Sequence, residues 1–206
     1  MVHLVTVLSL LAVAGVSTAA PTGGVPITVK NSCSYSVQVK QLTNGGSGGQ
    51  SSTLSAGSST EISVPSNWGG RIWGHKENDE STNAASLAEF LLRNPADGSD
   101  YYDVSFVDGY NLPMSIAPNG QSADSSNGYI CGTPSCAKLP TCPSDSEVKD
   151  SNGNVVGCQS SCRDCTSSRY ADTVGASCPD VYAYSTDDTT SMFACKASGY
   201  TVTFCP

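Results

Sequence analysis

Residues Tyr101–Met114 read YYDVSFVDGYNLPM, and they close a longer stretch, Leu87–Met114, around which the rest of the chain is organised. The longer stretch carries three carboxylates, Glu89, Asp103 and Asp108. Apolar and polar residues alternate on both sides of a turn that contains Pro and Gly, and this period of two is typical of half-buried β-strands. The stretch therefore predicts strands whose carboxylates contribute to one functional site.

The same alternation recurs along the chain, both inside and outside this stretch. Strand-like runs lie at Val25–Lys30, Tyr35–Lys40, Ser59–Val64, Arg71–Gly74, Leu87–Leu92, Tyr101–Val107, Leu112–Ile116 and Tyr200–Phe204. The Gly- and Ser-rich run Asn44–Ser52 predicts a flexible surface loop, and the polar run His75–Ser86 predicts a solvated loop. The pattern predicts an all-β fold, an antiparallel β-sandwich.

The length and the charge of the chain limit its function further. The 206 residues fit a single domain. There are 18 acidic and 10 basic residues, which give a net charge of −8. Because no basic patch is present to release counterions, this balance argues against nucleic acid and against an anionic membrane surface. We expect a monomer whose partner is neutral or cationic.

Residues 1–20, MVHLVTVLSLLAVAGVSTAA, contain no Lys, Arg, Asp or Glu. An apolar core, Leu8–Val16, is followed by the small residues Ser17–Ala20, which is typical of a cleaved secretory signal peptide. A transmembrane anchor is the alternative, but the apolar run is shorter than the roughly 20 residues that a span requires. We expect a signal peptide over residues 1–20 and a secreted domain over residues 21–206, located outside the cell or in a cell wall.

All ten cysteines follow the predicted signal: Cys33, Cys131, Cys136, Cys142, Cys158, Cys162, Cys165, Cys178, Cys195 and Cys205. An even number in an exported chain predicts five disulfides. A zinc site in CQSSCRDC is an alternative, disfavoured because the mature chain has a single histidine, His75. A thioredoxin-like use of Cys162 and Cys165 lacks a surrounding strand–helix pattern. The sequence alone does not determine the pairing, and we expect no metal and no other cofactor.

The composition changes after Ile116. Residues Ala117–Ser177 are rich in Cys, Ser, Gly, Asp and Pro and have few large apolar side chains. Such a segment cannot bury enough apolar surface to hold itself together. The sequence therefore predicts a disulfide-rich lobe over residues 117–177, inserted between sandwich segments 25–116 and 178–206.

The run YYDVSFVDGYNLPM, with LAEF upstream of it, resembles the signature of thaumatin-like proteins. NSCSYSV, GGRIWG, CPDVYAYSTDDTTSMFAC and YTVTFCP resemble further segments of that family in the same order. The resemblance implies a thaumatin-like sandwich of the small, ten-cysteine, pathogenesis-related type. It also implies the bridges Cys33–Cys205, Cys131–Cys195, Cys136–Cys178, Cys142–Cys158 and Cys162–Cys165. The Cys-rich insertion that larger members carry after the RIWG region is replaced here by HKENDESTNAAS, so one wall of the family's cleft is missing.

Several catalytic classes are unsupported by the sequence. There is no Gly-x-Ser-x-Gly elbow for a Ser-His-Asp arrangement, and His and carboxylate residues are too few for a catalytic zinc. Glycoside hydrolysis requires one protonated and one ionised carboxyl group. Glu89 shares a strand face with Leu87 and Leu91, and apolar surroundings raise a carboxyl pKa. We therefore predict Glu89 as the acid and Asp103 as its catalytic partner.

The resemblance implies an acidic cleft made of one Arg, one Glu and three Asp. These fall on Arg71, Glu89, Asp103, Asp108 and Asp187, with Asp188 as the second choice. The five-residue spacing from Asp103 to Asp108 places them on opposite faces of a regular strand, but the turn at Gly109 can redirect Asp108. The family's second Arg is His75 here. The alternative interpretation is that the acids are ordinary sheet-edge and turn residues.

Two functions remain open on the sequence. The first is binding of β-1,3-glucan in the acidic cleft with weak endo-β-1,3-glucanase activity. The second is a non-catalytic antifungal, defence or effector-like protein that binds glucan or a protein without turnover. Carboxyl groups about 5–5.5 Å apart indicate a retaining glycosidase, and about 6.5–9.5 Å an inverting one. The missing wall favours the more open, inverting arrangement.

Overall fold

The computed structural model describes residues 24–47, 49–79 and 84–206. The predicted signal peptide, residues 1–20, lies outside the described residues. Strands and two helices follow one another along the described chain in this order: β1 Gly24–Asn31, β2 Val37–Thr43, β3 Gln50–Leu54, β4 Ser59–Pro65, β5 Gly69–Lys76, β6 Leu87–Leu91, β7 Asp100–Ser105, β8 Gly109–Tyr110, β9 Met114–Pro118, β10 Ser135–Cys136, β11 Glu147–Lys149, β12 Val155–Gln159, α1 Arg169–Ser177, α2 Asp188–Ser191, β13 Phe193–Cys195 and β14 Tyr200–Phe204.

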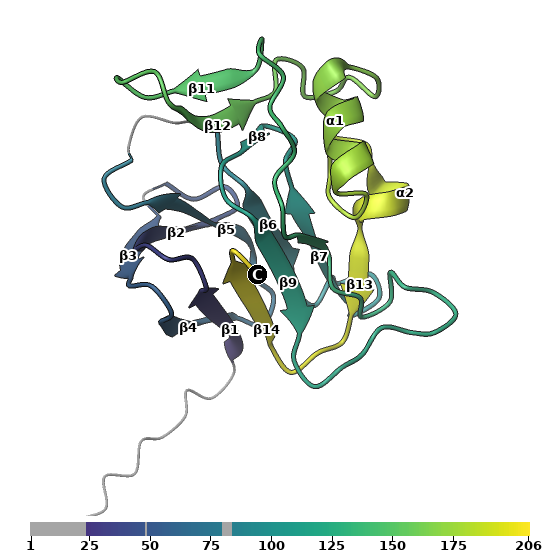
Figure 1. The fold of residues 1–206 in the computed structure, drawn as a ribbon. Coiled ribbons are helices and arrows are strands. Elements are labelled where there is room, and N and C mark those ends of the chain that lie inside the picture. Colours follow the sequence, from purple (N-terminus) through teal and green to yellow (C-terminus); the bar gives the residue numbers. More distant parts are fainter. Residues whose placement is uncertain (1–23, 48, 80–83) are drawn as a thin grey trace, which may run out of the picture.

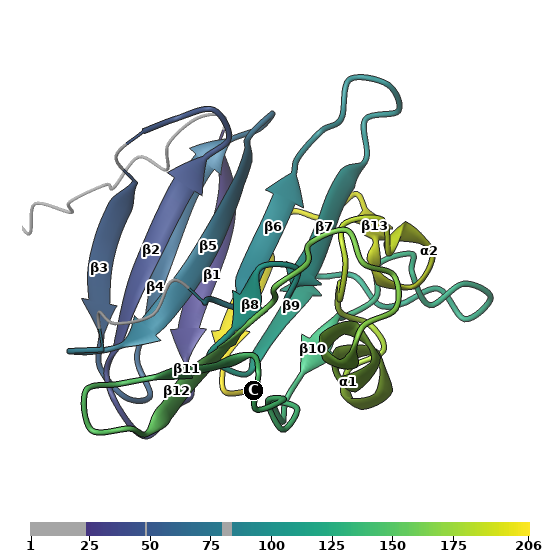
Figure 2. The same ribbon diagram turned by 90° about the horizontal axis from the view of Figure 1, so that it is seen from above.

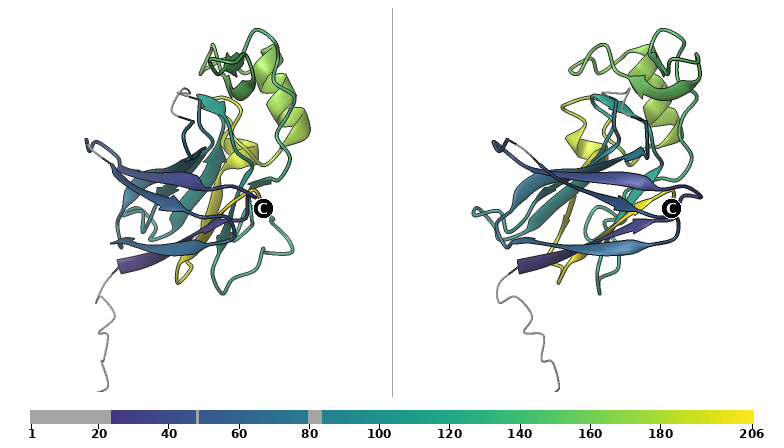
Figure 3. Two further views of the ribbon diagram at one scale, coloured as in Figure 1. Left: turned by 60° about the vertical axis from the view of Figure 1, so that its left-hand side comes forward. Right: turned by 90° about the vertical axis from the view of Figure 1, so that its left-hand side faces the viewer.

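Two large sheets pack face to face and form a β-sandwich (Figures 2 and 3). One sheet has the strand order β10-β9-β14-β1-β4, and the other has the order β13-β7-β6-β5-β2-β3. Pairs of these strands are antiparallel except β1 with β14, which run parallel and place the last strand of the chain beside the first. The prediction of an all-β antiparallel sandwich is confirmed, with this one parallel pair added.

The period of two in the sequence builds the core between the sheets. Alternate residues of β1 and β14, such as Ile27 and Tyr200, are fully buried. They face the inward side chains of β6 and β7, so that the Phe90 and Tyr200 rings lie 5.4 Å apart between centroids. The Tyr200 hydroxyl donates to the buried Asp100 carboxylate at 2.7 Å, which satisfies that charge inside the sandwich. The remaining, outward side chains of β6 and β7 are left free to form a surface.

A third sheet, of order β11-β12-β8, and helix α1 lie at one end of the sandwich (Figure 1). The sequence predicts no helix in this region. Helix α1 begins where the Ser168 hydroxyl accepts from the Ala171 amide at 3.0 Å, and Tyr170 and Val174 bury one face of it. Over the described ranges, neither α1 nor α2 has the length and apolar character that a bilayer span requires.

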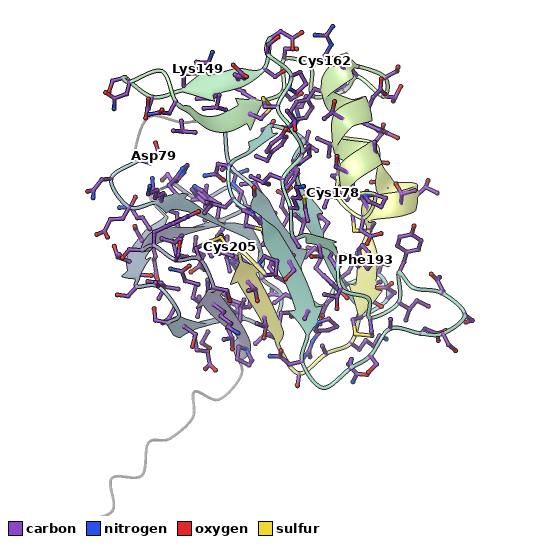
Figure 4. The ribbon with its side chains drawn as sticks, in the orientation of Figure 1. Asp79, Lys149, Cys162, Cys178, Phe193 and Cys205 are labelled. Atoms are coloured by element: carbon purple, nitrogen blue, oxygen red, sulfur yellow. A yellow bond between two sulfur atoms is a disulfide. The ribbon has the colours of Figure 1, made fainter. Side chains whose placement is uncertain are left out.

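Five disulfides join the ten cysteines in the pairs that the resemblance implies: Cys33–Cys205, Cys131–Cys195, Cys136–Cys178, Cys142–Cys158 and Cys162–Cys165. The first bridge closes a loop of 172 residues and links the end of β1 to the end of β14. In the chain-entropy account, a closure this long stabilises the fold by about 5 kcal/mol. Figure 4 shows Cys205 within the sandwich and Cys162 at the end that carries α1.

Two predicted loops differ from the structure. Part of the loop predicted at Asn44–Ser52 belongs to β3, whose polar residues form a strand by pairing with β2 at the sheet edge. His75, predicted in a solvated loop, lies in β5 opposite Gln38 and is only 7% exposed. Neither segment has the apolar alternation that is typical of a strand. Both form strands because their backbones pair with β2.

Candidate functional site

Three of the predicted site residues form one row across the outer face of the six-stranded sheet. Arg71 on β5 lies directly opposite Glu89 on β6, and Glu89 lies directly opposite Asp103 on β7. Directly opposed residues have Cβ atoms roughly 4.5–5.5 Å apart. The alternation that sends Ile72, Phe90 and other neighbours into the core therefore places one cation and two acids side by side outside it. We call Arg71, Glu89 and Asp103 the acid row.

The acid row lies beside a cleft of about 610 Å³. Its walls come from β6 and β7, from the segment between β12 and α1, and from the region of α2. The lining residues are Asn44, Gly70, Glu89, Phe90, Leu91, Asn94, Tyr101, Asp103, Ser105, Val107, Arg163, Tyr182, Ser185, Asp188 and Met192. Two of the three members of the acid row, Glu89 and Asp103, thus lie in the cleft itself.

The two carboxyl groups have different electrostatic surroundings. Burial raises the pKa of Asp103 well above its ordinary value, and the charges of Glu89 and Asp188 raise it further. Burial also raises the pKa of Glu89, but a hydrogen bond from Ser105 and the charge of Arg71 oppose that rise. Asp103 is thus the group that resists ionisation, and Glu89 is the group whose carboxylate has stabilising partners.

The TDDTTS segment contributes Asp188 to the cleft in place of the predicted Asp187. Asp188 accepts from the Tyr182 hydroxyl at 2.7 Å and extends the negative charge beyond Asp103. Asp187 accepts from the Thr190 hydroxyl at 2.8 Å and borders a separate hollow against α1. The difference arises because α2 begins at Asp188, and the preceding residue therefore points to the other side.

Asp108 lies at the edge of the site. It follows β7 just before Gly109, whose φ of 152° turns the chain as the sequence predicts. Asp108 borders a smaller hollow of about 190 Å³ together with Arg71 and Trp73, and its charge acts on Glu89. The Arg71 guanidinium lies 5.9 Å from the Trp73 ring centroid, so the ring holds it in a cation–π contact.

The sequence analysis did not identify Arg163, Ser105 or Tyr182 as site residues. The Arg163 guanidinium contacts the Asp108 carboxylate at 2.8 Å, although the two residues are 55 positions apart. Arg163 lies inside the four-residue ring CRDC, and this motif predicts an exposed, constrained loop. The motif does not indicate which part of the molecule the loop contacts. Ser105 is identifiable in principle, because it lies two residues after Asp103 on the same strand face.

One end of the cleft is neutral. Leu91 is 42% exposed and lies opposite Tyr101 on the neighbouring strand, in the next outward row after Glu89 and Asp103. The Tyr101 hydroxyl donates to Asp97 at 2.7 Å, which fixes the ring at the surface. The amides of Asn44 and Asn94 border the same end. This surface offers an apolar face and amide groups next to the acids.

The described residues contain no group of three or more His, Cys, Asp or Glu arranged to hold a metal ion. All ten cysteines lie within the described ranges and are disulfide-bonded. The polar side chains that line the cleft carry carboxyl, guanidinium, hydroxyl and amide groups.

Comparisons with known proteins find the Thaumatin family over residues 76–206. The chain is 33% identical to the pathogenesis-related thaumatin-like protein 3.5 of Cryptomeria japonica, over 89% of this chain and 91% of that protein. It is 32% identical to a protein of Prunus avium named glucan endo-1,3-beta-glucosidase, over 87% of this chain and 90% of that protein. Among solved structures, the thaumatin-like xylanase inhibitor TLXI matches with a TM-score of 0.48 and 16% identity, covering 88% of this chain and 99% of that one.

Proposed function

This chain belongs to the thaumatin family, and from that premise we propose that it is a secreted protein that binds β-1,3-glucan in the cleft and hydrolyses it weakly. The observation that carries the proposal is the acid row, in which directly opposed strands place Glu89 between a cation and a second carboxyl group. A glycosidase requires such a pair, one carboxyl protonated and the other ionised. The relative named glucan endo-1,3-beta-glucosidase supports the choice of substrate class.

The neutral end of the cleft supports a sugar as the ligand. Pyranose rings have apolar faces and hydroxyl edges, and they suit a surface that combines Leu91 and Tyr101 with the amides of Asn44 and Asn94. A neutral polymer also meets no repulsion from the carboxylates, whereas an anionic polysaccharide does. This end would hold the sugar units next to the bond that is broken.

We assign the two catalytic roles in the reverse of the order predicted from the sequence. Asp103 is flanked by Glu89 and Asp188 and is half-buried, so it stays protonated and donates to the leaving oxygen. Glu89 faces Arg71 and accepts from Ser105, so it serves as the ionised nucleophile or as the base that activates water. The inverting mechanism expected from the missing wall stays a prediction.

The experiment that tests this function compares Glu89→Gln and Asp103→Asn on two β-1,3-glucosyl substrates. Both variants should lose at least about 100-fold in kcat on laminarin, because proton transfer by a positioned carboxyl contributes that much. On an aryl β-1,3-glucoside with a good leaving group, which needs no acid, Asp103→Asn should recover activity and Glu89→Gln should not. Reducing-sugar release and phenol release measure the two reactions.

The matched control is Asp187→Asn, which changes the same charge outside the cleft and should leave both rates unchanged. Binding of each variant to insoluble β-1,3-glucan is measured in parallel and should match the wild type. If the wild type binds glucan without turnover, the protein is a non-catalytic glucan-binding protein. If the wild type neither binds nor hydrolyses β-1,3-glucan, the proposed function is wrong.

A further inference from the structure

We propose that Arg163 supplies the second positive charge of the acid row, as a positioning residue that the Cys162–Cys165 ring holds against Asp108 and Glu89. The consequence for turnover rests on the proposed function of the cleft, but the electrostatic claim about Glu89 does not. Among the described residues that line the cleft, Arg163 is the only one with a cationic side chain. Three carboxyl groups, those of Glu89, Asp103 and Asp188, line the same cleft.

The ring presents Arg163 in a defined direction. The Cys162–Cys165 disulfide closes a loop over a separation of three residues, and Arg163 is the first residue inside it. The Arg163 carbonyl accepts from the Ser185 amide at 2.9 Å, and the Asp164 carboxylate accepts from the Ser185 hydroxyl at 2.5 Å. These bonds attach the ring to the segment that leads into α2.

A second attachment fixes the ring to the turn that follows β7. The Ser160 amide donates to the Asp108 carbonyl at 3.2 Å, and the Arg163 guanidinium contacts the Asp108 carboxylate at 2.8 Å. The ring therefore connects the turn after β7 with the segment before α2, and Arg163 lies between them. The side chains of Arg163 and Asp108 are 60% and 50% exposed, so their ion pair contributes little to stability.

Arg163 completes an asymmetry between the two catalytic carboxyl groups. The charges of two cations act on Glu89: Arg71 on the neighbouring strand β5, and Arg163 on the ring. Asp103, on β7, faces Glu89 on one side and Asp188 of α2 on the other. Asp108 is the remaining charged group that acts on Glu89, and the Arg163 contact offsets it. Charge thus favours an ionised Glu89 beside a protonated Asp103.

The position of His75 explains why a second cation is needed from elsewhere. The resemblance places an Arg of the family's cleft at residue 75, where this chain has a histidine. The His75 ring is buried against Asn111, with 3.2 Å between its Nδ1 atom and the amide nitrogen. Burial lowers the pKa of His75, which favours a neutral ring at physiological pH. Arg163 provides from the disulfide ring the second positive charge that a neutral His75 does not provide.

The test is an NMR titration of the Glu89 side-chain carboxyl in protein labelled with 13C-glutamate, with the signal assigned by Glu89→Gln. Arg163→Gln should raise the pKa of Glu89, because it removes a charge that stabilises the carboxylate, and Arg163→Lys should restore most of the difference. The double variant Cys162→Ser/Cys165→Ser should raise it in the same direction by less, since Arg163 is present but no longer held. The control is Lys149→Gln, which removes a cation of a surface ion pair on β11 whose side chain is 52% exposed, against 60% for Arg163 (Figure 4).

Turnover provides the second measurement. In Arg163→Gln the acidic limb of the kcat/KM profile on laminarin should move to higher pH, with a loss of about threefold on that limb, the effect of an exposed charge. An unchanged Glu89 titration in Arg163→Gln overturns the proposal, and an unchanged titration in the double cysteine variant overturns the role of the ring. If the wild type has no glucan turnover, the hydrolytic part of the proposed function fails while the NMR titration still decides the role of Arg163.

Discussion

Strands β5, β6 and β7 present two faces that differ in almost every physical respect. The inner face carries Ile72, Phe90 and Tyr102, which are buried in the core between the sheets. The outer face carries Arg71, Glu89 and Asp103 at the alternate positions of the same strands. Adjacent residues in the sequence therefore belong to two surfaces, an apolar one that stabilises the sandwich and a charged one that borders the cleft.

The energetic origin of the two faces is also different. Apolar burial on the inner face is nearly independent of pH and grows with the area removed from water. On the outer face two carboxyl groups lie side by side, and their cost depends on how many of them are ionised. Changes in side-chain size should therefore alter the stability of the fold mainly through the inner face, and changes in pH should alter it mainly through the outer face.

The largest expected effect is on the inner face. Phe90→Ala should lower the free energy of unfolding by about 3–5 kcal/mol, because it removes a ring that contacts Trp68, Tyr102 and Tyr200 and leaves a cavity. Leu91→Ala is the matched control. Leu91 follows Phe90 in the sequence and is 42% exposed, so its truncation should cost less than about 1 kcal/mol. Urea denaturation of both variants with intact disulfides measures the difference. Equal losses at the two positions would contradict the assignment of the faces.

An intermediate effect of opposite sign is expected on the outer face. Asp103→Asn should raise the free energy of unfolding at pH 7 by at least about 1 kcal/mol, because the folded protein holds the Asp103 proton that the unfolded chain releases, and asparagine has no such proton to lose. The folded protein holds the Asp103 proton more tightly than the unfolded chain, so stability falls as pH rises above the ordinary value of 3.8. The gain in Asp103→Asn should therefore disappear below about pH 4. Thermal unfolding of wild type and variant at pH 3.5 and pH 7 measures this, and a gain that is the same at both values would refute it.

Much of this division into faces follows from the sequence. The period of two in LAEFLL and YYDVSFV predicts which side chains share a face, and it places Glu89 with Leu87 and Leu91. It does not give the register between strands, which depends on pairing over long sequence separations. The direct opposition of Arg71, Glu89 and Asp103 is therefore visible only in the folded sheet.

The sequence did not predict Arg163 and predicted Asp188 only as the second choice after Asp187. These two residues reach the cleft because a disulfide ring and a one-turn helix fix local directions that no apolar pattern encodes. Residue spacing cannot distinguish Asp187 from Asp188, since the residue at which α2 begins decides which of the two side chains lines the cleft with Asp103. The strand β3 is a similar case, because pairing with β2 rather than its own polar sequence makes it a strand.

The smallest expected effect concerns His75, a buried residue of β5 that contacts Asn111. The Asn111 amide oxygen accepts from the Ser86 amide at 3.0 Å, so the Asn111 amide nitrogen faces His75 as a donor, and the Nδ1 atom must accept. This contact requires the neutral ring, and burial together with the charge of Lys40 lowers the pKa of His75 although Asp79 opposes this. Because the folded pKa lies below the ordinary value of 6.5, the contribution of His75 to stability is present above pH 6.5 and is lost as pH falls through the folded value.

Between pH 7.5 and pH 5, wild type should therefore lose up to about 1 kcal/mol more than His75→Gln, which cannot take up a proton. Urea denaturation gives the change in the free energy of unfolding between the two pH values for each protein. Both proteins contain Asp103, so its opposite pH dependence cancels when the two changes are compared. An imidazole NMR titration gives the His75 pKa directly. A His75 pKa at or above 6.5, or equal losses in the two proteins, would show that this end of the outer face does not respond to pH.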